Sequence, residues 1–190
     1  MVNLLVDQVN WPKEYPYAPQ TRVELSNDHE ALYLHWHVRG EQLRAVTTQD
    51  QGPVWEDSCV EFFCQVPGDE HYMNFETNCI GAMVATRRLG KNEGIEPFTP
   101  DQMATIQRRC TFPREVIEER DGMAEWEVEL RIPLALIFGD RQIAFPQTLR
   151  ANFYKCADLT KRPHYVSWQP IQLPTPNFHC PEFFGEIILD

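Results

Sequence analysis

Basic residues are scarce in this sequence of 190 residues. Only 17 Lys and Arg stand against 28 Asp and Glu, which gives a net charge of −11. Nucleic-acid-binding domains carry a basic patch and a high pI, so the composition argues against a nucleic-acid partner. An anionic membrane surface is a poor partner for the same reason. Neutral and cationic ligands are compatible with this charge.

Long apolar runs are missing as well. No stretch approaches the roughly 18 apolar residues of a transmembrane helix, so we predict no membrane span. The N-terminal residues Met1–Asp7 lack the basic start and the longer apolar segment of a secretory signal. We therefore expect a cytoplasmic protein from the sequence as it stands, and a secreted one if a leader has been trimmed.

Glycine is infrequent and proline is not, with 9 Gly against 15 Pro. Proline inside a helix costs about 3 kcal/mol, so long helices are disfavoured. Short apolar runs separated by Pro and aromatic residues are typical of an all-β domain. The length fits one domain, and we predict a single domain over residues 1–190.

The motifs of several enzyme classes are absent. The sequence contains no GxSxG nucleophile elbow, no HExxH and no glycine-rich phosphate loop. Glu61 and Glu76 form the one carboxylate pair that could act in glycoside hydrolysis. We predict no catalytic residues and a protein that is not an enzyme, with a glycoside-acting enzyme as a less favoured alternative.

Metal-binding patterns are equally sparse. The six cysteines never occur at CxxC spacing, which argues against a thiolate zinc site, and we interpret them as reduced, buried residues. His35 and His37 are two residues apart on one strand face, a spacing that suits two ligands of one metal, but no third ligand is evident. We predict no metal site and no cofactor.

Alternating apolar residues are the clearest structural signal. In residues 31–38, Leu32, Leu34, Trp36 and Val38 fall on one face, which is the period of a half-buried strand. We predict strands at 21–25, 31–38, 59–66, 71–79, 81–88, 124–132, 149–156, 164–168 and 184–189. Short helices are predicted at 100–107 and 133–138, and 108–119 is left open. The pattern favours an antiparallel β-sandwich of the immunoglobulin-like or jelly-roll-like kind, with a barrel as the alternative.

A polar face emerges on one predicted hairpin. The Pro67–Asp69 turn joins strands 59–66 and 71–79, so Glu61 is expected to share a face with Asn74, Glu76 and Asn78. A buried carboxylate is costly unless it is hydrogen-bonded. The carboxylates and amides on this face suit sugar hydroxyls, and a satisfied internal network is the alternative.

Two tryptophans next to prolines extend this hypothesis. Trp55 follows Gly52-Pro53 and Trp168 precedes Gln169-Pro170, so both are expected in loops. Indole rings stack on the flat C–H faces of pyranoses and donate an N–H, whereas core packing is the alternative for any one of them. His179 and Glu182 lie in a later aromatic loop, where anchoring of the loop is the favoured role.

Five motifs in order carry a resemblance. They are Val54–Phe63, Tyr72–Asn78, Arg150–Cys156, His164–Trp168, and Asn177–His179 with Pro181–Gly185. Together they resemble the carbohydrate-binding family 9-like proteins, relatives of the family 9 modules attached to xylanases. The resemblance covers about residues 23–189.

The resemblance implies a β-sandwich with a sugar held between two tryptophans. In the xylanase modules a Trp precedes a binding Glu by six positions, which is the spacing of Trp55 and Glu61. Glu76 and Asn78 then correspond to a polar pair on the next strand. Trp168 corresponds to the second stacking ring, with Asn152 or Tyr154 as a polar neighbour.

We therefore predict non-catalytic binding of a mono- or oligosaccharide, with the reducing end as a candidate epitope. The expected ligand-binding residues are Trp55, Glu61, Glu76, Asn78, Asn152 and Trp168. A haem or redox module is the alternative from a different class, because the wider sandwich superfamily includes such domains.

Overall fold

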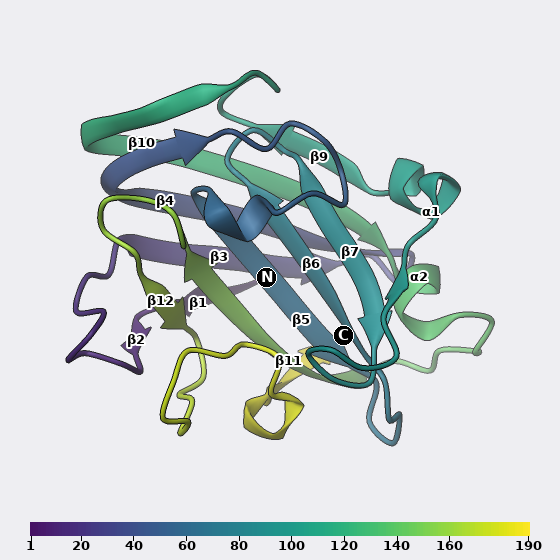
Figure 1. The fold of residues 1–190 in the computed structure, drawn as a ribbon. Coiled ribbons are helices and arrows are strands. Elements are labelled where there is room, and N and C mark those ends of the chain that lie inside the picture. The colour runs from purple at the N-terminus through teal and green to yellow at the C-terminus, as the bar shows by residue number, and fades with distance from the viewer.

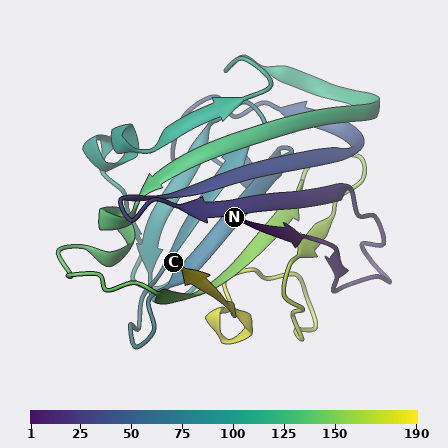
Figure 2. The same ribbon diagram turned by 180° about the vertical axis from the view of Figure 1, so that it is seen from behind.

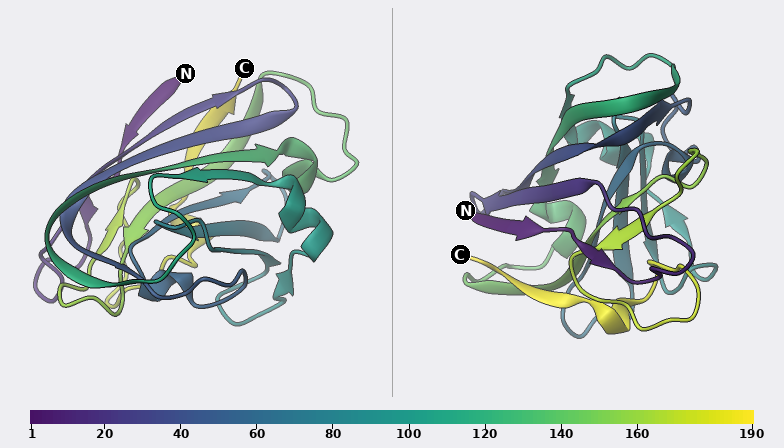
Figure 3. Two further views of the ribbon diagram at one scale, coloured as in Figure 1. Left: turned by 90° about the horizontal axis from the view of Figure 1, so that it is seen from above. Right: turned by 90° about the vertical axis from the view of Figure 1, so that its left-hand side faces the viewer.

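The computed structural model describes residues 1–190 and consists of two antiparallel sheets packed face to face (Figure 1). Figure 3 views the two layers from their edges. The smaller sheet, which faces the viewer in Figure 2, contains in spatial order β1 (Val2–Leu5), β3 (Gln20–Asn27), β4 (Ala31–Ala45), β10 (Ile117–Pro133) and β9 (Gln107–Cys110).

The larger sheet carries the features that matter for function. It contains in spatial order β2 (Gln8–Val9), β12 (Tyr165–Ser167), β11 (Gln147–Cys156), β5 (Cys59–Gln65), β6 (Tyr72–Asn78), β7 (Met83–Arg88) and β8 (Glu96–Pro97). Strand β13 (Gly185–Leu189) also pairs with β11. The predicted antiparallel β-sandwich is therefore confirmed.

Helical structure is limited to short segments. They are η1 (Val54–Glu56), α1 (Pro100–Thr105), α2 (Leu134–Phe138) and η2 (Pro181–Phe183). Helix α1 begins with a capping box, in which Thr99 and Gln102 each bond the backbone N–H of the other. None of these helices has the length and apolar character that crossing a membrane requires.

The predicted strands are present, several of them longer than predicted. The segment 108–119, left open from sequence, contains the end of β9 and the start of β10. The register of β10 against β4 shifts twice between Ile117 and Met123. Such bulges interrupt the alternation of apolar and polar residues, which explains why the sequence did not predict a strand in this part of β10.

The larger sheet is buried on both faces. Its inner face packs on the smaller sheet through residues such as Phe62, Phe75 and Phe153. Its outer face carries a second apolar cluster, in which Phe63 and Tyr154 lie under C-terminal segments. This double coverage explains why every residue of β5 is buried. All six cysteines are free, and five of them are buried.

Candidate functional site

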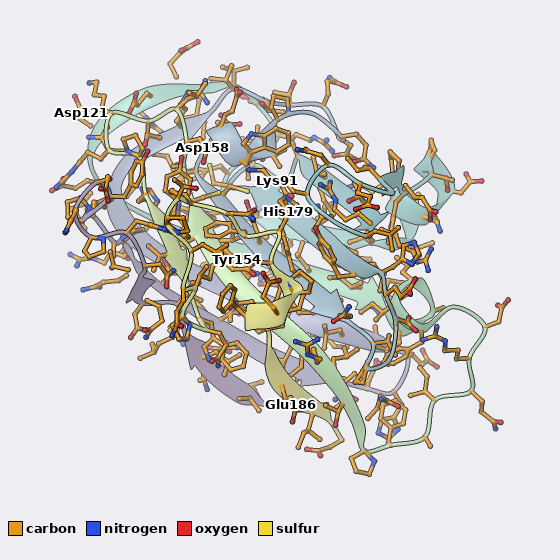
Figure 4. All side chains as sticks on the ribbon, turned by 60° about the horizontal axis from the view of Figure 1, so that its bottom comes forward. Lys91, Asp121, Tyr154, Asp158, His179 and Glu186 are labelled. Carbon is orange, nitrogen blue, oxygen red and sulfur yellow. The ribbon has the colours of Figure 1, made fainter.

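A cavity of about 390 Å³ lies on the outer face of the larger sheet. Its lining comes from η1, from β5, β6, β7, β11 and β12, and from loops that follow them. The lining residues are Trp55, Glu61, Glu76, Arg88, Lys91, Asn92, Ile95, Cys156, Asp158, Tyr165, Pro176, Asn177, Phe178 and His179. Figure 4 shows Lys91, Asp158 and His179 together over the strands, with Asp121 and Glu186 at remote ends of the molecule.

Two carboxylates form the floor of this cavity. Glu61 on β5 pairs directly with Glu76 on β6, and the two side chains are only 3% and 4% exposed. The Cys156 thiol donates to Oε1 of Glu61 at 3.0 Å, and the Asn74 amide donates to Oε1 of Glu76 at 2.8 Å. Directly opposite residues of an antiparallel pair lie on one face, so both carboxyl groups line the same cavity.

A chain of hydrogen bonds ends at Glu76. Arg88 donates from Nε to the Thr86 hydroxyl at 2.8 Å, and this hydroxyl donates to Oδ1 of Asn74. The Asn74 amide then donates to Glu76. Every donor points along the chain towards the carboxyl group, so Glu76 is held in one orientation at the cavity floor.

Burial dominates the electrostatics of the floor. It raises the pKa of Glu76 to about 7, against the lowering effects of Arg88 and Asn74. Burial also raises the pKa of Glu61 well above its usual value, with Cys156 and Glu76 adding to the effect. The pKa of Asp158 rises to about 6 because of burial. Near neutral pH the floor therefore offers both protonated donors and ionised acceptors.

The raised pKa of Glu76 predicts that the stability of the protein depends on pH. Ionisation of Glu76 is disfavoured in the folded state, so its contribution to stability falls as pH rises from about 4.5 towards 7. Replacing Glu76 by Gln should remove that loss. The unfolding free energy of the variant, relative to the parent, should rise by up to about 3 kcal/mol between about pH 5 and about pH 8.

Urea unfolding at the two pH values measures this effect. Glu186→Gln is a matched control, because Glu186 is exposed on β13, far from the cavity (Figure 4). A difference between Glu76→Gln and the parent that stays constant with pH would contradict the prediction.

Aromatic residues bound the cavity. Trp55 on η1 is 39% exposed, and its carbonyl accepts the backbone N–H of Asp158 at 3.0 Å. Tyr165 and Phe178 also line the cavity, with ring centroids 6.1 Å apart in an edge arrangement. Phe178 in turn stacks on Tyr154 at 4.1 Å, which fixes the C-terminal loop on the sheet.

Three of the six predicted binding residues, Trp55, Glu61 and Glu76, line the cavity together. The structure places Asn78 outside it. Its amide donates to the Thr47 carbonyl and to Asp57, and its Oδ1 accepts from Ala82 N–H. Both ends of the amide are therefore engaged in holding a loop. For Asn78 this matches the alternative given from sequence, a satisfied internal hydrogen-bond network.

Asn152 and Trp168 also lie outside the cavity. Asn152 accepts from and donates to the backbone of Gln169, so it anchors the chain after β12. The Trp168 ring packs edge-on against Phe153, with centroids 5.7 Å apart, beside the inter-sheet core. Tyr165 and Phe178, rather than Trp168, are the aromatic residues that share the cavity with Trp55.

Sequence reasoning missed several lining residues. Two of them carried a signal in the sequence. Alternation puts Arg88 on the same strand face as Thr86, and Asp158 lies only two residues after the predicted strand 149–156, so both could have been placed near the polar face. His179, expected to anchor its loop, shares a 2.8 Å hydrogen bond with the Tyr72 hydroxyl and lines the cavity as well. Burial lowers the pKa of His179 to about 3, assisted by Arg88 and Lys91, so the ring is neutral.

Fold and cavity define a β-sandwich domain with a polar, aromatic-bounded cavity on the outer face of one sheet. The family model of carbohydrate-binding family 9 matches residues 2–189, and the chain belongs to this family.

Solved structures agree with this assignment. The chain is similar to a "putative carbohydrate-binding protein" from Bacteroides uniformis ATCC 8492, with 37% identity, a TM-score of 0.93 and coverage of 100% of this chain and 87% of that one. A family 9 carbohydrate-binding module from Caldicellulosiruptor kristjanssonii in complex with glucose is 15% identical, with a TM-score of 0.54 and coverage of 97% and 84%. The structure of such a module from the same organism with cellotriose is 14% identical, with a TM-score of 0.55 and coverage of 91% of this chain and 76% of that one. These two show the fold alone. Among curated proteins none matches the sequence.

Proposed function

We propose that this protein binds a mono- or oligosaccharide in the Trp55 cavity without cleaving it. The observation that carries the proposal is the placement of an exposed indole beside two buried carboxyl groups in one cavity. Membership of carbohydrate-binding family 9 supports it, as do the glucose and cellotriose complexes of the Caldicellulosiruptor module.

The chemistry of the lining suits a sugar. The Trp55 face stacks on the C–H face of a pyranose, while Glu61 and Glu76 bond its hydroxyls. Arg88 and Lys91 add donors at the same cavity. A volume of about 390 Å³ is near the lower end for ligand sites, so one or two sugar units fit better than a long chain. This size favours binding of a chain end.

Titration of the full chain with sugars, followed by Trp fluorescence, tests the proposal. The panel includes glucose, xylose, cellobiose and cellotriose. Trp55→Ala should weaken the affinity for any sugar that binds by about tenfold or more, since buried Trp residues dominate binding energy. Trp168→Phe is the matched control, because Trp168 lies outside the cavity, and it should retain binding. Absence of any response over the panel would overturn the proposal.

The reducing end is the candidate epitope within this proposal. Reduction of cellotriose to its alditol opens only the terminal ring, so a site for the reducing end should lose affinity for the alditol. Equal affinity for both forms would show that the protein binds another part of the oligosaccharide, and the proposal of sugar binding itself would stand.

Geometry favours binding over hydrolysis. Glycosidases place two carboxyl groups so that they flank the scissile bond. Glu61 and Glu76 are side by side on one sheet face and approach a ligand from the same side. Hydrolysis of a glycoside that disappears in Glu61→Gln would establish the enzymatic alternative. The haem alternative needs an axial pair of His or Met, and the cavity lining contains one His and no Met.

A further inference from the structure

A second cluster of ligating side chains lies on the outer face of the smaller sheet, away from the sugar cavity. Strands β3, β4 and β10 run side by side there (Figure 2). Glu24 on β3 pairs with His35 on β4, and Glu127 on β10 pairs with His37. The strand register therefore gathers two imidazoles and two carboxylates that are distant in sequence.

The two imidazoles turn towards each other. Their ring centroids are 4.0 Å apart, and one ligand atom from each of Glu24, His35 and His37 lies within 4.8 Å of the others. Nε2 of His37 lies 3.3 Å from Oε1 of Glu24. This carboxylate is the third ligand that the sequence does not reveal, because it comes from the neighbouring strand.

Glu127 prepares His37 for a metal. It lies 3.0 Å from Nδ1 of His37 and, through its other oxygen, 3.0 Å from Nε2 of His35. When Nδ1 carries the proton and donates to Glu127, Nε2 keeps its lone pair. That nitrogen is buried and has no hydrogen-bond partner, although it faces Glu24. Oε1 of Glu24 also accepts from Arg22, whereas Nε2 of His37 has no partner, so the lone pair of this nitrogen is free for a cation beside the carboxylate.

We infer that Glu24, His35 and His37 bind a divalent transition-metal ion of the Zn²⁺ type. Imidazole and carboxylate are ligands of Zn²⁺, whereas Ca²⁺ and Mg²⁺ take oxygen ligands. Zn–N and Zn–O bonds of about 2.0–2.2 Å put ligand atoms roughly 3.5 Å apart, so small side-chain rotations close the site. The fourth position is open to water, because these residues lie at the surface.

Neighbouring residues supply a supporting shell. Arg22 donates to Oε1 of Glu24 at 2.7 Å and fixes this carboxylate, and Glu127 holds both imidazoles. Glu127 is therefore a positioning residue, and such outer-shell carboxylates contribute about 10–100-fold to metal affinity.

Calorimetric titration of the metal-stripped full chain with ZnCl₂ tests the inference. The parent should bind one equivalent at this site. His37→Gln and Glu24→Gln should each weaken Zn²⁺ binding by more than about 100-fold, and Glu127→Gln by about 10–100-fold. His29→Asn is the control, because His29 is exposed with a φ of 69°, a conformation that Asn tolerates, and it should bind as the parent does.

Co²⁺ spectra locate the bound metal. Two other clusters have side chains that suit such an ion: the buried group of Cys59, Glu61 and Cys156, and the group of His35, Glu127 and Glu129, which does not use His37. Binding at the His site gives visible d–d bands without a sulfur-to-cobalt charge-transfer band. A charge-transfer band, no binding by the parent, or unchanged binding in His37→Gln would overturn the inference. None of these outcomes depends on sugar binding.

Discussion

Replacing Asp57 by Ala is expected to lower the free energy of unfolding by about 3–5 kcal/mol. Asp57 is fully buried and forms a salt bridge with Arg44 at 2.5 Å. It also accepts the backbone N–H groups of Val46 and Thr47 and the Asn78 amide, at 2.9–3.0 Å. Truncation would leave a half-buried guanidinium and three donors unpaired, which costs more than the lost bonds themselves.

The same variant should also affect the Trp55 cavity. Asp57 directly follows η1, which carries Trp55, and it ties this segment to residues 46 and 47. Even under conditions where the variant is folded, Trp55 should be less well positioned and sugar binding should be weaker.

Urea unfolding measures the loss, and two variants make the result specific. Asp140→Ala removes an exposed aspartate and should change stability by less than about 0.5 kcal/mol. Asp57→Asn keeps the shape and one acceptor, and should fall between the parent and Asp57→Ala. A loss below about 1 kcal/mol in Asp57→Ala would show that the network is solvated or replaceable.

Local pattern was sufficient for the floor of the cavity. The turn at Pro67–Asp69 sets the register of the β5–β6 hairpin, and alternation then decides which side chains share a face. Sequence reasoning therefore predicted that Glu61 and Glu76 lie together, and the register confirms it. The Trp55 position next to this floor follows from its short distance to β5 in the chain.

The aromatic residues of the cavity that come from the C-terminal part of the chain could not be predicted in this way, because their positions depend on pairing between segments distant in sequence. Trp168 follows β12, where Tyr165 belongs to the outer cluster and Val166 to the inter-sheet core. Alternation places Trp168 with Val166, so its ring turns inward to Phe153. The neighbouring proline indicated a loop but carried no information about this direction. Phe178 reaches the cavity only through its stacking on Tyr154, a contact with no local signature.

The inter-sheet core around Trp168 gives the second prediction with a large effect on stability. Phe153→Ala should destabilise the protein by about 3–5 kcal/mol. Phe153 is fully buried on the inner face of β11, and its ring contacts Phe62, Trp36 and Trp168 at centroid distances of 5.1, 5.8 and 5.7 Å. Truncation would leave a cavity between the sheets and remove three aromatic contacts, each of which adds to the lost burial.

Thermal or urea unfolding measures this loss, with Phe112→Ala as the control from the edge of the same core. Phe112 is only partly buried, so its truncation should cost much less. Under conditions where Phe153→Ala is folded, its sugar affinity should equal that of the parent, because Phe153 and Glu61 lie on opposite faces of one sheet. Trp55→Ala should show the reverse pattern, with little change in stability and weak binding. Loss of sugar affinity in folded Phe153→Ala would instead show that the inter-sheet core shapes the cavity directly.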